Sequence, residues 1–255
     1  MSAGYDNGSC DLFEQIRALY SELALHPEKD FGWGKGKENA LALGYNHNWL
    51  EGLPDAVWES SSAVGNPFSC GPIHPGETVI DLGCGAGADV YVAALLVGPR
   101  GSVIGVDVTP AMVQKARDNT VRASLANVSI YEADMANLPL PDSCADVVIS
   151  NGAINLLPEK PCALKEAFRV LKRGGRFQIA DMIRDESTPQ CERVTNGSWA
   201  NCVGGTVTVS CFIRMLAEIG FVRVACIKTT GYRTSASTIG ALFFRTEAIE
   251  VKRPP

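Results

Sequence analysis

The feature that most constrains the fold is a regular alternation of short apolar runs with longer helix-like segments, which begins at Glu77. The expected strands are 78–82, 102–108, 128–132, 146–150, 177–180, 221–228 and 238–245, and the expected helices are 88–97, 110–124, 159–172 and 210–219. Strands that alternate with helices of this length form right-handed crossovers, so we predict a doubly wound α/β fold with a mostly parallel sheet. Only about nine residues separate the last two strands, which predicts a hairpin with an antiparallel final strand.

Residues 1–75 lack this alternation and are predicted to form a helical cover over the main domain, residues 76–255. Apolar residues recur there at the spacing of an amphipathic helix, at Leu12, Phe13, Ile16, Leu19, Tyr20 and Leu23. Asp11 precedes this helix as a start signal, and Pro27 lies just beyond its end. A glycine-rich connector is expected at 31–37, a short helical piece at 41–43 and a loop at 60–75.

Charge and hydropathy exclude several kinds of partner. The chain carries 23 Lys and Arg against 28 Asp and Glu, whereas proteins that follow phosphate backbones usually have a basic excess. Its longest clean apolar run, residues 90–97, is far below the roughly 18–20 residues of a membrane span. No apolar stretch follows the first cation, Arg17, as it would in a signal peptide. We therefore expect a cytoplasmic protein that binds neither nucleic acid nor membrane.

The nine cysteines are expected to be reduced thiols, because their number is odd and the chain is too long for a disulfide-stapled mini-protein. No Cys-x-x-Cys pair occurs, and His26, His47 and His74 show no ligand spacing. We therefore predict no metal site.

The most informative segment lies between the first strand and the first helix of the main domain and reads Val-Ile-Asp-Leu-Gly-Cys-Gly-Ala-Gly at 79–87. In an open α/β sheet, ligands bind at the carboxyl ends of the strands. Glycines at this point permit a tight turn and a close backbone approach, and the following helix N-terminus favours an anionic group. The segment therefore predicts a nucleotide-like ligand at this edge of the sheet.

Two ligands fit the glycine spacing. Gly83, Gly85 and Ala88 match the loose Gly-x-Gly-x-x-Gly/Ala pattern of dinucleotide-binding proteins, which would indicate a nicotinamide-dependent oxidoreductase. Asp81 argues against that alternative, because a carboxylate just before the glycines would repel a pyrophosphate. The same carboxylate would attract S-adenosylmethionine (SAM), which has an ammonium and a sulfonium, together with a carboxylate for the helix end.

Polar side chains also follow the next three strands. Asp107 ends the second strand, where an acid can accept hydrogen bonds from both ribose hydroxyls. Asp134 follows the third strand, where it can accept from an adenine amino group while Met135 covers the ring, and Asn151 follows the fourth. Met112 is either a further contact to the adenine or a core residue. The predicted cofactor-binding set is Asp81, Gly83, Cys84, Gly85, Gly87, Asp107, Val108, Met112, Asp134, Met135 and Asn151.

Residues from about 78 to 228 resemble class I SAM-dependent methyltransferases. The resemblance rests on Asp81 followed by the Gly-x-Gly-x-Gly loop at 83–87, and on Phe-Arg-Val-Leu-Lys-Arg-Gly-Gly at 168–175. It implies a Rossmann-like sheet of seven strands, SAM as the cofactor and transfer of a methyl group to a small-molecule acceptor. A SAM-binding module without activity is kept as a third hypothesis.

A closer resemblance covers roughly residues 43–231 and is to the arsenite methyltransferase family. It rests on Leu-Gly-Tyr at 43–45, Gly-Asn-Pro at 65–67, Ile-Ser-Asn at 149–151, Ile-Asn-Leu at 154–156 and Cys-Val-Gly-Gly at 202–205. The resemblance implies trivalent arsenic held on thiolates, since soft ligands suit soft centres. This chain has Val64, Val90 and Gly152 where the family has thiols, and Cys202 alone is left at a matching position. Arsenite or thiol methylation is therefore an alternative to a general small-molecule acceptor.

Methyl transfer from a sulfonium is an in-line displacement, in which the protein mainly aligns the nucleophile with the methyl carbon. A thiol, trivalent arsenic or an electron-rich carbon is a nucleophile that needs little help from a general base. No histidine follows His74 in the sequence, so a histidine base in the main domain is not expected. Cys202 is the candidate for contact with the acceptor, together with Trp199, and Cys70, Cys191 and Cys211 are candidate replacement thiols. Candidate bases are Tyr5, Asp89, Glu132 and Asp181. The oligomeric state is left open.

Overall fold

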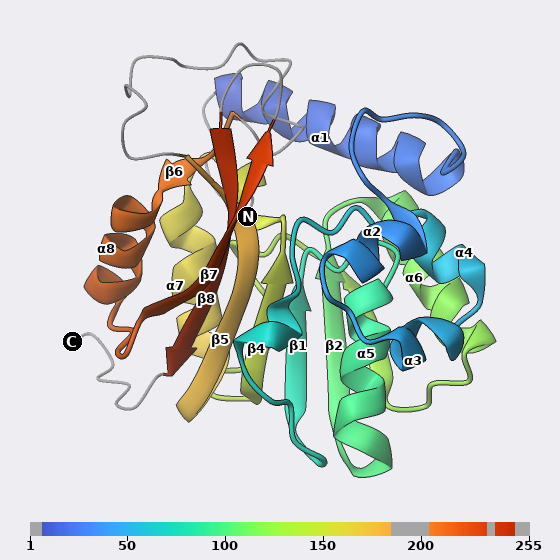
Figure 1. Cartoon of the computed structure of the whole chain (residues 1–255). Helices are drawn as coiled ribbons and strands as arrows, with labels where there is room; N and C mark the ends of the chain where they lie inside the picture. The colour runs from blue at the N-terminus through green and yellow to red at the C-terminus, as the bar shows by residue number, and fades with distance from the viewer. Residues whose placement is uncertain (1–6, 185–203, 234–237, 248–255) are drawn as a thin grey trace.

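The computed structural model describes residues 7–184, 204–233 and 238–247, which form one twisted sheet with helices on both faces (Figure 1). The strands are β1 (Thr78–Leu82), β2 (Ser102–Asp107), β3 (Val128–Glu132), β4 (Ala145–Asn151), β5 (Leu171–Arg184), β6 (Val207–Thr208), β7 (Ala225–Arg233) and β8 (Thr238–Glu247). Their order is β3-β2-β1-β4-β5-β8-β7, with β6 paired to the end of β5. The chain therefore starts the sheet in its middle and winds outward in both directions.

The strand directions agree with the sequence pattern. β1 to β5 pair in parallel, whereas β8 is antiparallel to both β5 and β7. The predicted doubly wound α/β fold and the antiparallel final strand are therefore confirmed. The predicted number of seven strands is one too low for the described residues, because β6 has only two residues and is too short to show a strand pattern.

Helices cover the sheet and precede it. They are α1 (Asn7–Leu25), α2 (Gly36–Ala42), α3 (His47–Glu51), α4 (Asp55–Glu59), α5 (Ala88–Val97), α6 (Pro110–Arg122), α7 (Lys160–Val170) and α8 (Val209–Ile219), with short 3-10 turns η1 (Pro67–Cys70), η2 (Gly98–Arg100) and η3 (Ile154–Leu156). The sequence pattern does not predict α3 and α4, because five residues are too few to show a helical period. No helix in the described part of the chain combines the length and apolar composition needed to cross a membrane.

The junction of α7 and β5 differs from expectation. α7 ends at Val170 rather than at 172, and β5 begins at Leu171 rather than at 177. Gly174 has a φ of +76°, and the pairing of β4 with β5 shifts register between Ala145 and Val147. This irregular, glycine-containing start conceals the strand pattern in the sequence.

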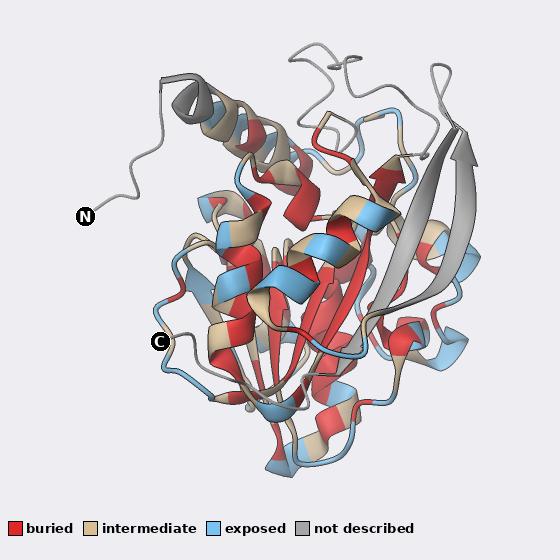
Figure 2. Cartoon of the chain, turned by 90° about the vertical axis from the view of Figure 1, so that its left-hand side faces the viewer, coloured by how far each residue is buried: buried red, intermediate tan, exposed pale blue. Residues whose placement is uncertain are grey.

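Alternate strand residues face two hydrophobic clusters. Ile80 and Val148 pack with α7 and α8, while Val79 and Val147 pack with α5 and with residues of the N-terminal segment 40–73. Both faces of the central strands are buried (Figure 2), which explains why these strands are continuously apolar in sequence. The N-terminal segment therefore shares a core with the sheet.

An ion pair joins Glu77, the residue before β1, to Arg176 of β5, on the far side of β4. Arg176 donates from its two Nη atoms to the two carboxylate oxygens of Glu77 over 2.9 and 2.7 Å. The two side chains are only 15% and 16% exposed. Burial alone would raise the pKa of Glu77, but the hydrogen bonds from Arg176 and from the His74 amide outweigh it and hold the pKa below its ordinary value.

We predict that Glu77→Gln lowers the free energy of unfolding by about 1–2 kcal/mol near neutral pH. Since the folded-state pKa is depressed, the carboxylate stabilises the fold above its unfolded pKa, and this contribution is lost as the pH falls through the folded pKa. Urea unfolding at decreasing pH should therefore show the difference between wild type and variant shrinking. The control is Asp55→Asn, whose side chain is 79% exposed beside Lys37. A difference that stays constant on acidification would contradict the assignment.

Candidate active site

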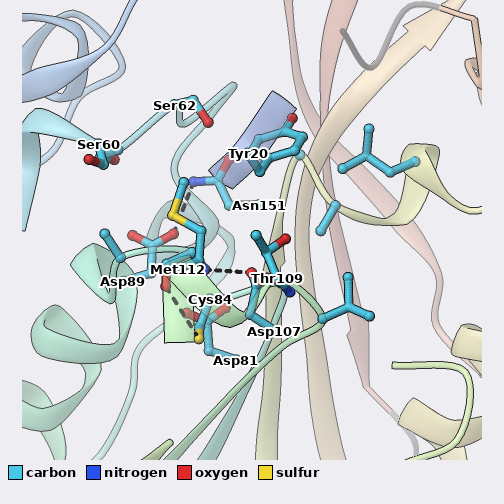
Figure 3. A pocket seen from close by; sticks show the side chains of 18 of the residues that line it. Tyr20, Ser60, Ser62, Asp81, Cys84, Asp89, Asp107, Thr109, Met112 and Asn151 are labelled. Atoms are coloured by element: carbon cyan, nitrogen blue, oxygen red, sulfur yellow. Dashed lines mark hydrogen bonds between the residues drawn. The ribbon is translucent and has the colours of Figure 1, made fainter. Parts of the chain in front are cut away.

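A cavity opens at the carboxyl ends of β1, β2 and β4 (Figure 3). The empty space in this cavity and its solvent-filled mouth together is about 900 Å³. Phe13, Ile16 and Tyr20 of α1 cover it, and the segment 60–63 borders another side. The sequence predicts a helical cover here, but it does not indicate which residues of that helix reach the cavity.

The turn between β1 and α5 has a backbone conformation that glycine adopts most readily. Gly83, Gly85 and Gly87 have φ values of +75°, +52° and +92°. At Gly83 a Cβ atom would lie 2.3 Å from the Cβ of Ala153, so the glycine loop and the segment after β4 meet without room for a side chain. Gly83 and Gly85 line the cavity. Gly87 is not among the lining residues; it packs against Ala116 and is the N-cap of α5.

Asp81, near the end of β1, lines the cavity and is only 2% exposed. Its Oδ2 atom has no hydrogen-bond partner. Burial raises the pKa of Asp81 well above its ordinary value, and the neighbouring Asp89 and Asp107 carboxylates raise it further. A buried carboxyl oxygen without a partner is costly unless a ligand supplies a donor or a positive charge.

Asp107 ends β2 and organises the glycine loop. Its Oδ2 accepts a hydrogen bond from the Gly85 amide at 2.9 Å, and its Oδ1 accepts one from the Thr109 amide at 2.8 Å. Burial raises the pKa of Asp107, although these amide donors oppose the shift. Asp107 lines the cavity, and its two hydrogen bonds also fix the turn of the glycine loop.

A hydrogen-bond network joins the end of β4 to α5 and to the N-terminal segment. Asn151 Nδ2 lies 3.0 Å from Asp89 Oδ2 and 3.0 Å from the Tyr45 hydroxyl, and its Oδ1 accepts from the amides of Val64 and Gly65. Tyr45 donates its hydroxyl to Asp89 Oδ1 at 2.6 Å. Asn151 lines the cavity, and its side chain ties three parts of the chain together.

The remaining predicted cofactor residues fall into two groups. Cys84, Val108, Met112 and Met135 line the cavity. Burial raises the pKa of the Cys84 thiol well above its ordinary value, so this cysteine is a poor nucleophile. Asp134 is not among the lining residues, and its Oδ1 accepts a hydrogen bond from the Ala136 amide at 2.8 Å, as in a local turn.

The candidate catalytic residues Cys202 and Tyr5 lie outside the described residues, as do Cys191 and Trp199. Cys70 is buried beside Ala180. Val64 and Gly152 are two of the positions at which the resembled family has thiols. They lie against each other, since a Cβ atom built at Gly152 would be 3.2 Å from a Val64 methyl carbon. Among the described residues, no group of three or more His, Cys, Asp and Glu side chains could hold a metal ion.

Sequence reasoning names Asp89 only as a candidate base and does not name Tyr45 as a site residue. The signal for Asp89 is an acid in the first turn of α5, a helix whose other residues are almost all apolar. Such an acid is expected to be buried and therefore to have a specific partner. Tyr45 has no comparable signal, because its partner lies 44 residues away.

We predict that Tyr45→Phe lowers the free energy of unfolding by about 1–3 kcal/mol, because the buried Asp89 carboxylate loses its hydroxyl donor. The phenyl ring keeps its edge contacts with Trp49, Trp58 and Phe68, so the fold is retained. The matched control is Tyr91→Phe, which removes a hydroxyl bound to the Gly52 carbonyl at 2.8 Å and should cost about 1 kcal/mol or less. If chemical denaturation shows that the two variants lose the same free energy of unfolding, the result would argue against a special role for the hydrogen-bond network around Asp89.

Residues 73–220 match the family described as Methyltransferase domain. An arsenite methyltransferase from Halobacterium salinarum is 40% identical over 179 residues, which are 70% of this chain and 46% of that protein. The Homo sapiens arsenite methyltransferase is 31% identical over 167 residues, or 60% of this chain and 44% of that protein. The chain thus spans about half the length of the curated relatives it matches.

A solved structure extends the comparison to three dimensions. CrArsM, an arsenic (III) S-adenosylmethionine methyltransferase from Chlamydomonas reinhardtii, has a TM-score of 0.66 and 30% identity, with 86% of this chain and 74% of that chain covered. The family match covers more than half of the chain, which confirms the predicted resemblance. The chain therefore belongs to the class I SAM-dependent methyltransferases, and within them it is similar to the arsenite methyltransferases.

Proposed function

We propose that this chain binds SAM in the cavity and transfers its methyl group to a small-molecule acceptor, in the cytoplasm. The observation that carries the proposal is the buried Oδ2 of Asp81, which has no hydrogen-bond partner. Asp81 is 2% exposed, and it lines the cavity together with Asp89 and Asp107. A cationic ligand relieves the repulsion among these carboxylates, whereas a pyrophosphate would add to it. The same observation disfavours the nicotinamide-dependent oxidoreductase.

The lining residues fit the parts of SAM. Asp81 would attract its cationic groups, and Asp107 would accept hydrogen bonds from the ribose hydroxyls. Met112 and Met135 would supply apolar cover for the adenine. When bound, SAM supplies a methyl group on a positively charged sulfur, which is a good leaving group. The protein aligns the acceptor with that methyl group and excludes water from the cavity.

The described surroundings favour an acceptor that needs no general base. None of the described residues that line the cavity is a histidine. Asp89 is bound to Tyr45 and Asn151, and Asp181 is 1% exposed and accepts hydrogen bonds from Asn155 Nδ2 and the Met182 amide. Both carboxylates are already committed to the protein, so a soft or intrinsically reactive nucleophile suits the site.

Arsenite or another thiophilic acceptor is the second candidate. The named relatives favour it, since two of them are arsenite methyltransferases and a third is an arsenic (III) methyltransferase. The contact between Val64 and Gly152 weighs against it, because an apolar methyl group and a bare backbone cannot ligate a metalloid. We therefore keep arsenite as the alternative to an organic acceptor.

We predict that Asp81→Asn weakens SAM binding by about 10- to 100-fold, because the ligand loses a charged partner. The same change should leave the free protein as stable as wild type or more stable, since it removes one of three neighbouring buried carboxylates. Isothermal titration calorimetry and chemical denaturation measure the two effects. Unchanged SAM affinity, or binding of a nicotinamide dinucleotide in place of SAM, would overturn the assignment.

The acceptor can be assigned with methyl-labelled SAM. We expect arsenite with added thiol to be methylated more slowly than the best compound in a panel of thiols and phenols, because residues 64 and 152 supply no thiolate. Arsenite turnover above that of the panel, which Cys202→Ser abolishes, would replace our proposal with the alternative. Cys162→Ser changes an exposed thiol and is the control.

A further inference from the structure

Three carboxyl groups line the cavity, and none of the described lining residues is a basic side chain that could form an ion pair with them. Asp81, Asp89 and Asp107 come from three different elements, β1, α5 and β2, and all three line it (Figure 3). None of the described residues that line the cavity is Lys, Arg or His. Positive charge for this cluster must therefore come from the ligand or from protons.

The hydrogen bonds within the cluster come from neutral groups. Asp107 accepts from two backbone amides, and Asp89 accepts from the Tyr45 hydroxyl and the Asn151 amide. Asp81 Oδ2 has no partner. One buried oxygen of the cluster therefore lacks a hydrogen-bond donor, and it belongs to a residue that lines the cavity.

Other titratable and charged groups lie on the elements around the cavity, and of these Tyr45 donates its hydroxyl to Asp89. They are Tyr20 and Arg17 on α1, Tyr45 before α3, Cys84 in the glycine loop and Lys115 on α6. Arg17 donates to the Val108 carbonyl at 3.2 Å, and Lys115 donates to the Ala24 carbonyl and to the Ser60 hydroxyl. Both of these cations therefore bind oxygens other than those of the three carboxylates.

Methyl transfer changes the charge of the cofactor. The bond from sulfur to the methyl carbon breaks, its electron pair stays on sulfur, and a new bond forms between the methyl carbon and the acceptor. The sulfonium becomes a neutral thioether, and its positive charge leaves with the methylated acceptor or with the proton that the acceptor loses. The product, S-adenosylhomocysteine, therefore carries one positive charge fewer than SAM.

Building on the proposed function, we propose that the Asp81–Asp89–Asp107 cluster distinguishes SAM from its demethylated product by charge, so that SAM binding releases more protons than product binding. Loss of the sulfonium leaves the cluster short of a positive charge. The product is then held less tightly unless the cluster takes up a proton. The cluster thus favours exchange of spent cofactor for SAM.

The direction of the pH dependence follows from the burial of these carboxyls. Burial holds the pKa values of all three above the ordinary carboxyl value, so the free cluster retains protons at a pH where exposed carboxyls have lost them. A sulfonium favours the ionised form. The ratio of the product dissociation constant to the SAM dissociation constant should therefore rise with pH, by up to about tenfold per pH unit if one proton is linked.

The test uses the full chain and two probes, SAM and S-adenosylhomocysteine. Calorimetric titrations in phosphate and in Tris, from about pH 6 to about pH 8, measure both affinities and the number of protons exchanged. We expect more protons to be released with SAM, and a ratio of dissociation constants that rises with pH. Equal proton release and a pH-independent ratio would overturn the inference while leaving SAM binding intact. Failure of both probes to bind would instead overturn the proposed function.

Variants assign the effect to the cluster. Asp81→Asn should reduce both the difference in proton release and the pH dependence of the ratio. Glu218→Gln, which removes a side chain 69% exposed on α8, should retain both. Because the proton count is also measured on the wild-type protein, the test does not depend on the folding of a variant. An undiminished proton difference in folded Asp81→Asn would show that the linked proton lies elsewhere and would contradict the assignment.

Discussion

Electrostatic repulsion among three buried carboxylates is the constraint on which the site depends. Parallel strands bring their carboxyl ends to one edge of the sheet, so acids at the ends of β1 and β2 meet there, and α5 adds Asp89 from its first turn. Backbone amides stabilise Asp107, and a hydroxyl and an amide stabilise Asp89, but Asp81 keeps one bare oxygen. A cavity built in this way is suited to an organic cation.

The N-terminal segment is part of this site as well as of the core. Tyr45 reaches Asp89, and the amides of Val64 and Gly65 reach Asn151, so the segment is tied to α5 and β4 by hydrogen bonds. The aromatic rings around Tyr45 pack in the cluster that also contains Val79 and Val147. Covering the cavity and completing the fold are therefore physically coupled, and a change in this segment is expected to affect both.

Much of this arrangement could be predicted from sequence, because it follows from local patterns. β1, β3 and α5 have the predicted bounds, since clear apolar runs end at Gly, Pro or acidic residues. Asp81 and Asp107 lie where the parallel topology requires. The sequence could not distinguish a ligand contact from a local cap at Asp134, because an acid after a strand suits both roles. The pairing of Tyr45 with Asp89 leaves no local signal, because the two residues are 44 positions apart in the chain, and β6 is too short to leave one.

The most direct test of the account follows the Asp81 carboxyl itself. In protein labelled with carbon-13 at the aspartate carboxyl, with the signal assigned by its loss in Asp81→Asn, nuclear magnetic resonance reports the protonation of Asp81 across a pH titration. The account predicts a pKa above the ordinary carboxyl value in the free protein and a lower pKa when SAM is bound. An ordinary pKa in the free protein, or a pKa that SAM does not change, would contradict it.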